Sequence, residues 1–193
     1  MFSSATFFLA VALTGSATAD MQLGIQAFKD EDYVQAAMEF TLGARQGNSQ
    51  AQVNLGLLYE NGLGVERDAT EAFKWYETAA RRDNVLAQIN LAALYFEGIG
   101  IDQNDAMAAH WYHRAAMRGN ATAQYNLAIM FEGGRGVELD LVQAWAWLEL
   151  AARQDAEVLE WERTALTEKL TADEVQAAQA LLKHYQIRYE HVD

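Results

Sequence analysis

The sequence contains neither proline nor cysteine. Without proline, the residue that most strongly interrupts helices is missing, so long helical runs are favoured. Without cysteine, disulfides, thiolate metal sites and a cysteine nucleophile are excluded together. Basic residues are also scarce, because 14 Lys and Arg stand against 27 Asp and Glu, and the net charge is −13. Such a chain repels phosphate backbones, so we expect no nucleic-acid partner.

The first nineteen residues have the features of an export signal. No charged side chain precedes Asp20, an apolar run extends over 7–13, and small residues lead to Ala17-Thr18-Ala19. This pattern predicts cleavage after Ala19. The run is shorter than the roughly 20 residues that span a bilayer. The alternative is a buried first helix. We expect a signal peptide over 1–19, a periplasmic or secreted protein, and no membrane insertion after cleavage.

A group of residues recurs along the chain at a step of 36. An Ala-Gln pair at 51–52 returns at 87–88 and 123–124. Other positions repeat at the same step: Asn54, Asn90 and Asn126; Leu55, Leu91 and Leu127; Gly62, Gly98 and Gly134; Gly64, Gly100 and Gly136; and Trp75, Trp111 and Trp147. So many coincidences at one period indicate an internal structural repeat.

Each repeat is predicted to form two helices. Ala51, Leu55 and Leu58 make an apolar stripe at helical spacing, and the glycines that follow end that helix. The second helix carries the tryptophan and an Ala-Ala pair, and a polar residue suited to helix capping precedes it. These capping positions are Asp32, Asp68, Asn104 and Asp140. One such pair cannot bury its apolar face alone, so the units must stack. We therefore predict an all-α fold, a right-handed α/α superhelical solenoid with a concave face.

The repeats resemble the Sel-one-like repeat family, a branch of the tetratricopeptide-like α/α repeats. The residues that carry the resemblance are Leu55-Gly56-Leu57-Leu58-Tyr59, Gly62-Leu63-Gly64-Val65, Asp68, Ala72, Trp75-Tyr76 and Ala79-Ala80. Three repeats are expected, over 49–84, 85–120 and 121–156, which together form a region 49–156. Residues 20–48 lack the Gly-x-Gly loop and are expected to form an N-terminal tetratricopeptide-like capping unit. Residues 157–193 are expected to be C-terminal capping helices, the last opened by Thr171 and Glu174.

Residues suited to catalysis or metal binding are few. His110 and His113 stand three apart, but no third ligand is evident, so a solvated helix face is the better interpretation. His184 and His191 are interpreted as surface residues. The sequence has no Gly-x-Ser-x-Gly, His-Glu-x-x-His or phosphate-binding motif. We expect no cofactor, no metal and no enzymatic activity. Some secreted members of the wider family are linked to β-lactam binding or hydrolysis, but they are cysteine-rich, which makes this alternative weak.

The resemblance also implies where a partner would bind. In related folds the first helices line the concave groove, and an asparagine before the Leu-Gly pair contacts a bound peptide. The candidate groove residues are Asn54, Asn90, Asn126, Val53, Ile89, Tyr125, Glu60, Phe96 and Glu132, with Leu57, Ala93 and Ile129 on the same face. An amide side chain offers both a donor and an acceptor to a peptide backbone. The alternative is that the asparagines bond between helices and stabilise the repeat.

Two roles remain open for such a scaffold. The first is an adaptor or regulator of envelope processes that binds a protein or peptide in its groove. The second is a structural component of an envelope assembly that makes its contacts through the convex face. A solenoid of this kind is either monomeric or stacked end to end.

Overall fold

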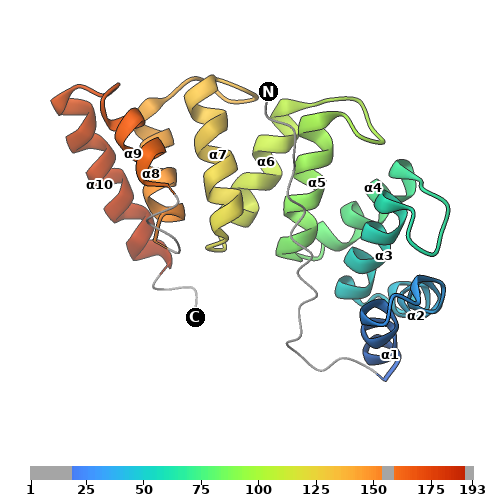
Figure 1. Cartoon of the computed structure of the whole chain (residues 1–193). Helices are drawn as coiled ribbons and strands as arrows, with labels where there is room; N and C mark the ends of the chain where they lie inside the picture. Colours follow the sequence, from blue (N-terminus) through green and yellow to red (C-terminus); the bar gives the residue numbers. More distant parts are fainter. Residues whose placement is uncertain (1–18, 154–158, 190–193) are drawn as a thin grey trace. The chain divides into compact units, whose positions relative to one another are not determined.

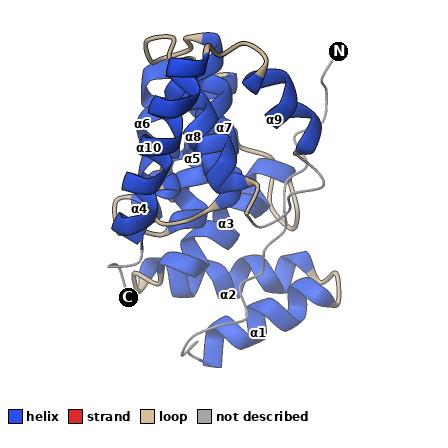
Figure 2. Ribbon diagram, turned by 90° about the vertical axis from the view of Figure 1, so that its left-hand side faces the viewer, coloured by secondary structure: helices blue, strands red, loops and turns tan. Residues whose placement is uncertain are grey.

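The computed structural model describes residues 19–153 and 159–189, and every regular element in these ranges is a helix (Figure 2). Ten helices follow one another along this part of the chain (Figure 1): α1 (Ala19–Lys29), α2 (Tyr33–Arg45), α3 (Ser49–Asn61), α4 (Ala69–Ala80), α5 (Val85–Glu97), α6 (Asp105–Ala116), α7 (Ala121–Gly133), α8 (Leu141–Ala151), α9 (Glu160–Thr167) and α10 (Ala172–Tyr189). None of them is long and apolar enough to cross a membrane. Apart from Ala19, the predicted signal peptide lies outside the described residues, as does His191.

The predicted all-α fold of helices in consecutive pairs is confirmed. The chain forms two compact units, the first ending at Trp75 and the second beginning at Tyr76, within α4. In the first unit, α1 packs on α2 and α2 packs on α3. In the second unit, α5 to α8 pack each on the next, and α8 also contacts both α9 and α10. Each unit thus buries its apolar surface between successive helices.

Polar side chains begin the second helix of each pair, as predicted. The carboxylate or amide oxygen accepts a backbone N–H bond from three residues further on, which satisfies a donor that has no partner inside the helix. These bonds are Gln35 to Asp32 at 3.1 Å, Glu71 to Asp68 and Met107 to Asn104 at 3.0 Å, and Gln143 to Asp140 at 2.9 Å. The last helix, α10, begins with the predicted Thr171–Glu174 capping box, in which Glu174 accepts the backbone N–H of Thr171 at 2.8 Å.

The first helices of the repeats begin at asparagines that act as caps. The backbones of Asn48, Asn84 and Asn120 are extended, with φ of −69°, −72° and −75°, and their side chains cap α3, α5 and α7. The preceding residues, Gly47, Asp83 and Gly119, take the left-handed conformation that ends the second helices. Each turn therefore ends one helix and starts the next within two residues.

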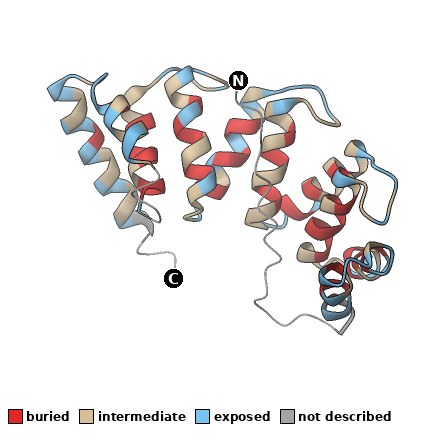
Figure 3. Ribbon diagram, in the orientation of Figure 1, coloured by how far each residue is buried: buried red, intermediate tan, exposed pale blue. Residues whose placement is uncertain are grey.

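Small residues allow close packing between helices. The alanine pairs at 79–80, 115–116 and 151–152 are almost fully buried, and Trp147 and Tyr76 are among the largest side chains without solvent contact. Figure 3 shows the buried residues concentrated in the repeat helices, whereas the connecting loops are mostly exposed. The loop after α7 approaches α6 so closely that a Cβ atom at Gly136 would overlap the carbonyl oxygen of Asp105. Only glycine fits this position, where φ is also +70°.

Candidate protein-binding face

The bonds that join successive helical pairs are made by glutamines. Gln52, Gln88 and Gln124 are 1–3 % exposed and follow the repeated alanine near the start of each first helix. Each donates its side-chain amide to a carbonyl near the end of the preceding second helix: Gln52 to Ala44 at 3.1 Å, Gln88 to Ala80 at 3.3 Å and Gln124 to Ala116 at 3.2 Å. Each of these carbonyls lies at the end of its helix and also accepts a backbone N–H from the turn that follows, from Gly47, Asp83 and Gly119 respectively. The recurrence of glutamine is visible in the sequence, but its structural role was not predicted.

The asparagines of the predicted ladder do not join helices in this way. Asn126 donates its amide to the carbonyl of Thr122, one turn earlier in its own helix, at 2.8 Å. Asn54 accepts a bond from Gln50, also one turn earlier, at 3.1 Å. These bonds lie within one helix, so they contribute nothing to the joint between repeats. Asn90 occupies the same position in α5 and is half-buried, as is Asn126.

Part of the predicted groove is closed, which corrects the expectation from the sequence. Val53, Asn54 and Glu60 are only 5–6 % exposed. The reason is that six consecutive residues of α3, 51–56, are buried, so more than one face of this helix is covered. The side chains at these three positions of α3 are therefore inaccessible to a partner, whereas the side chains at the equivalent positions of α5 and α7 are partly exposed.

The open part lies on α5 and α7, in the second unit, and we call it the ladder face. It consists of Ile89, Asn90, Ala93, Tyr125, Asn126 and Ile129. All six are at least partly exposed, and Ile129 reaches 37 %. Burial raises the pKa of the Tyr125 phenol, and the nearby carboxylates of Glu162 and Glu132 raise it further. The ladder face therefore combines amides and apolar groups with local negative charge.

Two predicted groove residues contact other parts of the chain. The guanidinium of Arg135 lies 3.8 Å from the centre of the Phe96 ring, a cation–π contact that covers one face of the ring. Lys169, in the turn after α9, binds the carboxylate of Glu132 at 2.6 Å. Phe96 and Glu132 thus already make contacts within the chain, with Arg135 and Lys169 respectively.

The helix α9 is anchored beside this region by side chains of α8. Arg163 makes two bonds to Glu149, at 2.7 and 2.8 Å. The indole N–H of Trp145 donates to the hydroxyl of Thr167 at 2.8 Å. Together with the Lys169–Glu132 pair, these contacts hold α9 against the third repeat, and they limit the ladder face at its C-terminal end. No periodic pattern in the sequence predicts this placement.

The described residues contain no group of three histidines, carboxylates or cysteines that could hold a metal ion. His110 and His113 are both exposed on α6, and their rings make edge contacts with Trp111 and Trp147. His184 is exposed on α10. The two histidines of α6 therefore lie on an exposed helix face, as the sequence suggested, and their rings also pack against neighbouring indoles.

Helical pairs joined by the same glutamine bond at a fixed step define a repeat scaffold, a fold that binds other proteins. The chain belongs to the Sel1 repeat family: the repeat matches residues 49–84, 85–120 and 121–155, more than half of the sequence. The predicted resemblance is therefore confirmed. Sel1 repeats typically mediate protein interactions, and the family is generally non-catalytic.

Two solved structures are similar to this chain. A protective antigen present in uropathogenic Escherichia coli strains, displaying an SLR fold, is 37 % identical with a TM-score of 0.74, covering 80 % of this chain and 33 % of that one. A Sel1 repeat protein from Oxalobacter formigenes is 29 % identical with a TM-score of 0.73, covering 82 % of this chain and 72 % of that one. These structures share the repeat fold with the described helices.

A shorter similarity extends to a eukaryotic protein. Over 66 residues the chain is 39 % identical to DAP3-binding cell death enhancer 1 of Rattus norvegicus, which corresponds to 33 % of this chain and 13 % of the rat protein. The chain thus spans a small part of the rat protein and a third of the Escherichia coli antigen.

Proposed function

We propose that this protein is an exported scaffold that binds a segment of another protein on the ladder face. The observation that carries the proposal is the division of roles between two kinds of amide. Buried glutamines join the repeats, so Asn90 and Asn126 are not needed for that joint and remain partly exposed. An exposed amide offers a donor and an acceptor, which suits a peptide backbone of any sequence.

The surroundings of these amides suggest the chemistry of the bound segment. Ile89 and Ile129 provide apolar contact area next to the asparagines. Glu162 acts electrostatically on Tyr125 from α9, so the C-terminal end of the face is acidic. A segment that pairs apolar side chains with Lys or Arg would complement both features. The net charge of −13 favours the approach of such a basic partner.

Export to the periplasm or beyond is part of this proposal. It rests on the apolar run and the Ala17-Thr18-Ala19 pattern at the N-terminus. The partner would then be an envelope or extracellular protein, and the scaffold would act as an adaptor or regulator. Sequencing the N-terminus of the protein recovered from the periplasm tests this point, and we expect the chain to begin at Asp20.

The binding proposal is tested by position-specific crosslinking in cells. A photo-crosslinking amino acid at position 129 should capture a discrete partner, because Ile129 lies on the ladder face. The same group at position 139 is the control, because Leu139 is 60 % exposed in the loop after α7. Capture of the same partner with equal yield at both positions would place the interface elsewhere.

Substitution of the asparagines then tests their role directly. Asn90→Ala with Asn126→Ala should weaken binding of the captured partner about tenfold, or about 1.4 kcal/mol. Asn61→Ala is a matched control, because Asn61 makes the same bond one turn back, to Leu57 at 2.9 Å, outside the ladder face. Circular dichroism checks that all variants fold. Undiminished binding by the folded double variant would refute a role for the ladder.

A further inference from the structure

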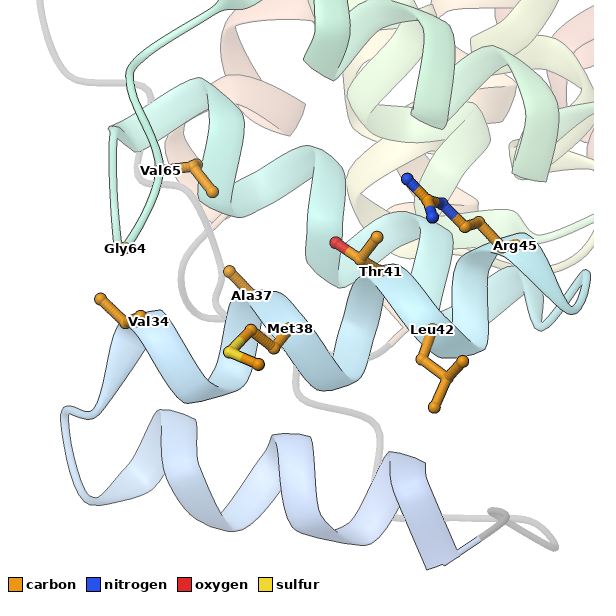
Figure 4. A pocket seen from close by; sticks show the side chains of 8 residues that line it. All are labelled: Val34, Ala37, Met38, Thr41, Leu42, Arg45, Gly64 and Val65. Carbon is orange, nitrogen blue, oxygen red and sulfur yellow. The ribbon is translucent and has the colours of Figure 1, made fainter.

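The outer side of α2 carries an exposed apolar stripe. Val34, Met38 and Leu42 follow one another at four-residue steps and are 60 %, 62 % and 46 % exposed. They border a cavity of about 460 Å³, which Figure 4 shows between α2 and the loop after α3. The remaining lining residues are Ala37, Thr41, Arg45, Gly64 and Val65. We call this feature the α2 groove.

The stripe is not a general property of the repeats. One repeat later its positions hold Thr70, Lys74 and Thr78, which are polar and exposed. Two repeats later they hold Ala106, His110 and Arg114. Apolar residues on α2 are therefore not needed for the repeat fold, and an exposed apolar stripe of this kind indicates an interaction surface.

The same protein shows what covers such a stripe elsewhere. In α8 the corresponding positions are again apolar, at Val142, Ala146 and Leu150. Ala146 and Leu150 are only 0 % and 4 % exposed, and α8 contacts both C-terminal helices, α9 and α10. In the second unit such a stripe thus lies on a helix that packs against C-terminal helices, and most of it is buried. The described residues of the first unit, 19–75, form only α1, α2, α3 and the start of α4.

A matching group is exposed on α9. Trp161 is 77 % exposed, the most of any large hydrophobic side chain in the described ranges. The helix that carries it is anchored by the Arg163–Glu149 and Thr167–Trp145 bonds, so the indole is presented from an ordered position. An aromatic side chain held in this way is typical of the residues that contribute most to protein interfaces.

The charges beside the two features are complementary. Trp161 lies between Glu160 and Glu162 in the sequence, and Glu160 is exposed. The α2 groove is lined by Arg45, and no carboxylate is among its lining residues. In a protein of net charge −13, most surfaces repel a second copy, so a groove whose one charged lining residue is Arg45 is a favourable place for an acidic helix to dock.

We propose that copies of this chain associate head to tail, with Trp161 of one copy bound in the α2 groove of the next. The two surfaces differ, so the contact is heterologous, and a dimer keeps one unoccupied groove and one unoccupied Trp161. Larger species then form by repeating the same contact. This association is separate from binding at the ladder face, and either can hold without the other.

Sedimentation velocity with two complementary variants tests the proposal. Met38→Glu blocks the groove and leaves Trp161 intact, whereas Trp161→Ser does the reverse. Wild type should show dimers and larger species that increase with concentration, and each variant alone should associate at least tenfold more weakly. An equimolar mixture should form a dimer that grows no further, because each copy then offers one functional surface.

The controls separate this contact from other causes of association. Both substituted side chains are exposed, so the variants should fold, and circular dichroism checks this. Leu139→Glu, at another exposed apolar side chain, should leave association unchanged. The chain with and without residues 1–19 should behave alike. Wild type that stays monomeric, a Trp161→Ser variant that still associates, or a mixture that stays monomeric would each overturn the proposal.

A charge exchange provides a second test. Arg45→Glu should weaken association, and Glu160→Lys with Glu162→Lys on the other copy should restore it. Restoration in the mixture of the two variants supports direct contact between these residues, and its absence contradicts the proposed orientation.

Discussion

Arg135, in the loop after α7, forms a two-point ion pair with Asp105, the first residue of α6, through bonds of 3.0 and 3.1 Å. The next residue in the loop, Gly136, lies directly over the backbone carbonyl of the same aspartate. One loop is thus fastened to the preceding pair of helices through both the side chain and the backbone of a single residue.

The ion pair makes stability depend on pH. Hydrogen bonds from Arg135 hold the pKa of Asp105 below its ordinary value of 3.8. A lowered pKa in the folded state stabilises the protein above that ordinary value, and the contribution is lost as the pH falls through the lowered pKa. Since both side chains are partly exposed, Asp105→Asn should cost no more than about 1 kcal/mol at pH 7. Urea unfolding at pH 7 and pH 3 should show this cost shrinking at the lower pH. Asp102→Asn, in the loop that precedes α6, controls for the change in net charge.

The backbone contact is tested with three glycines. Gly136→Ala should destabilise by more than about 2 kcal/mol, because it combines a steric overlap with a left-handed backbone. Gly119→Ala meets open space at φ of +79° and should cost about 1–2 kcal/mol from the backbone alone. Gly133→Ala lies in α7 with ordinary contacts and should be neutral or stabilising by up to about 1 kcal/mol. Thermal unfolding ranks the three, and equal losses at 119 and 136 would argue against the close approach.

The glutamine bond between repeats is tested by two substitutions at one position. Gln124→Ala removes the bond to Ala116 and leaves a cavity, so it should cost about 2–3 kcal/mol. Gln124→Met keeps most of the volume and removes a buried Oε1 that has no partner among the described residues, so it should cost about 1 kcal/mol or less. Denaturant unfolding distinguishes the two. A methionine variant as unstable as the alanine variant would show that the hydrogen bond outweighs packing here.

The anchoring of α9 is expected to be local. Arg163→Ala removes both bonds to Glu149, whose side chain is only 16 % exposed. Backbone amide exchange over 160–167 should therefore speed up several-fold, while α5 exchanges as before. Lys74→Ala removes an exposed pair with Glu71 in α4 and should leave exchange in α9 unchanged. Unchanged protection of α9 in Arg163→Ala would mean that Trp145 and Thr167 suffice to hold it.

The sequence predicted the parts of the fold that depend on local spacing. Asp140 caps α8, and Thr171 with Glu174 opens α10, because capping needs only a polar side chain a few residues from a free N–H. Local spacing does not predict that Gln124 joins two repeats whereas Asn126 bonds within its own helix. Both are amides in the same helix, and which one is buried is decided by how α7 rotates against α6, a tertiary property.

The candidate face shows the same limit. Asn54 and Asn90 occupy equivalent repeat positions, yet one is 5 % exposed and the other half-buried. Identical residues at identical spacing give no sign of what covers one of them. The placement of α9 depends on pairs such as Arg163–Glu149, which fall outside the 36-residue pattern and carry no periodic signal.

The glutamine bond has a consequence for how such proteins change length. It joins residues eight apart in the chain at each of its three occurrences. Deleting 85–120 joins Asn84 to Ala121 and leaves Gln124 eight residues after Ala80, so the same bond forms across the new junction. Unequal recombination between repeats of the gene can therefore shorten or lengthen the protein by whole repeats. Each new junction would be closed by the same glutamine bond that closes the existing junctions.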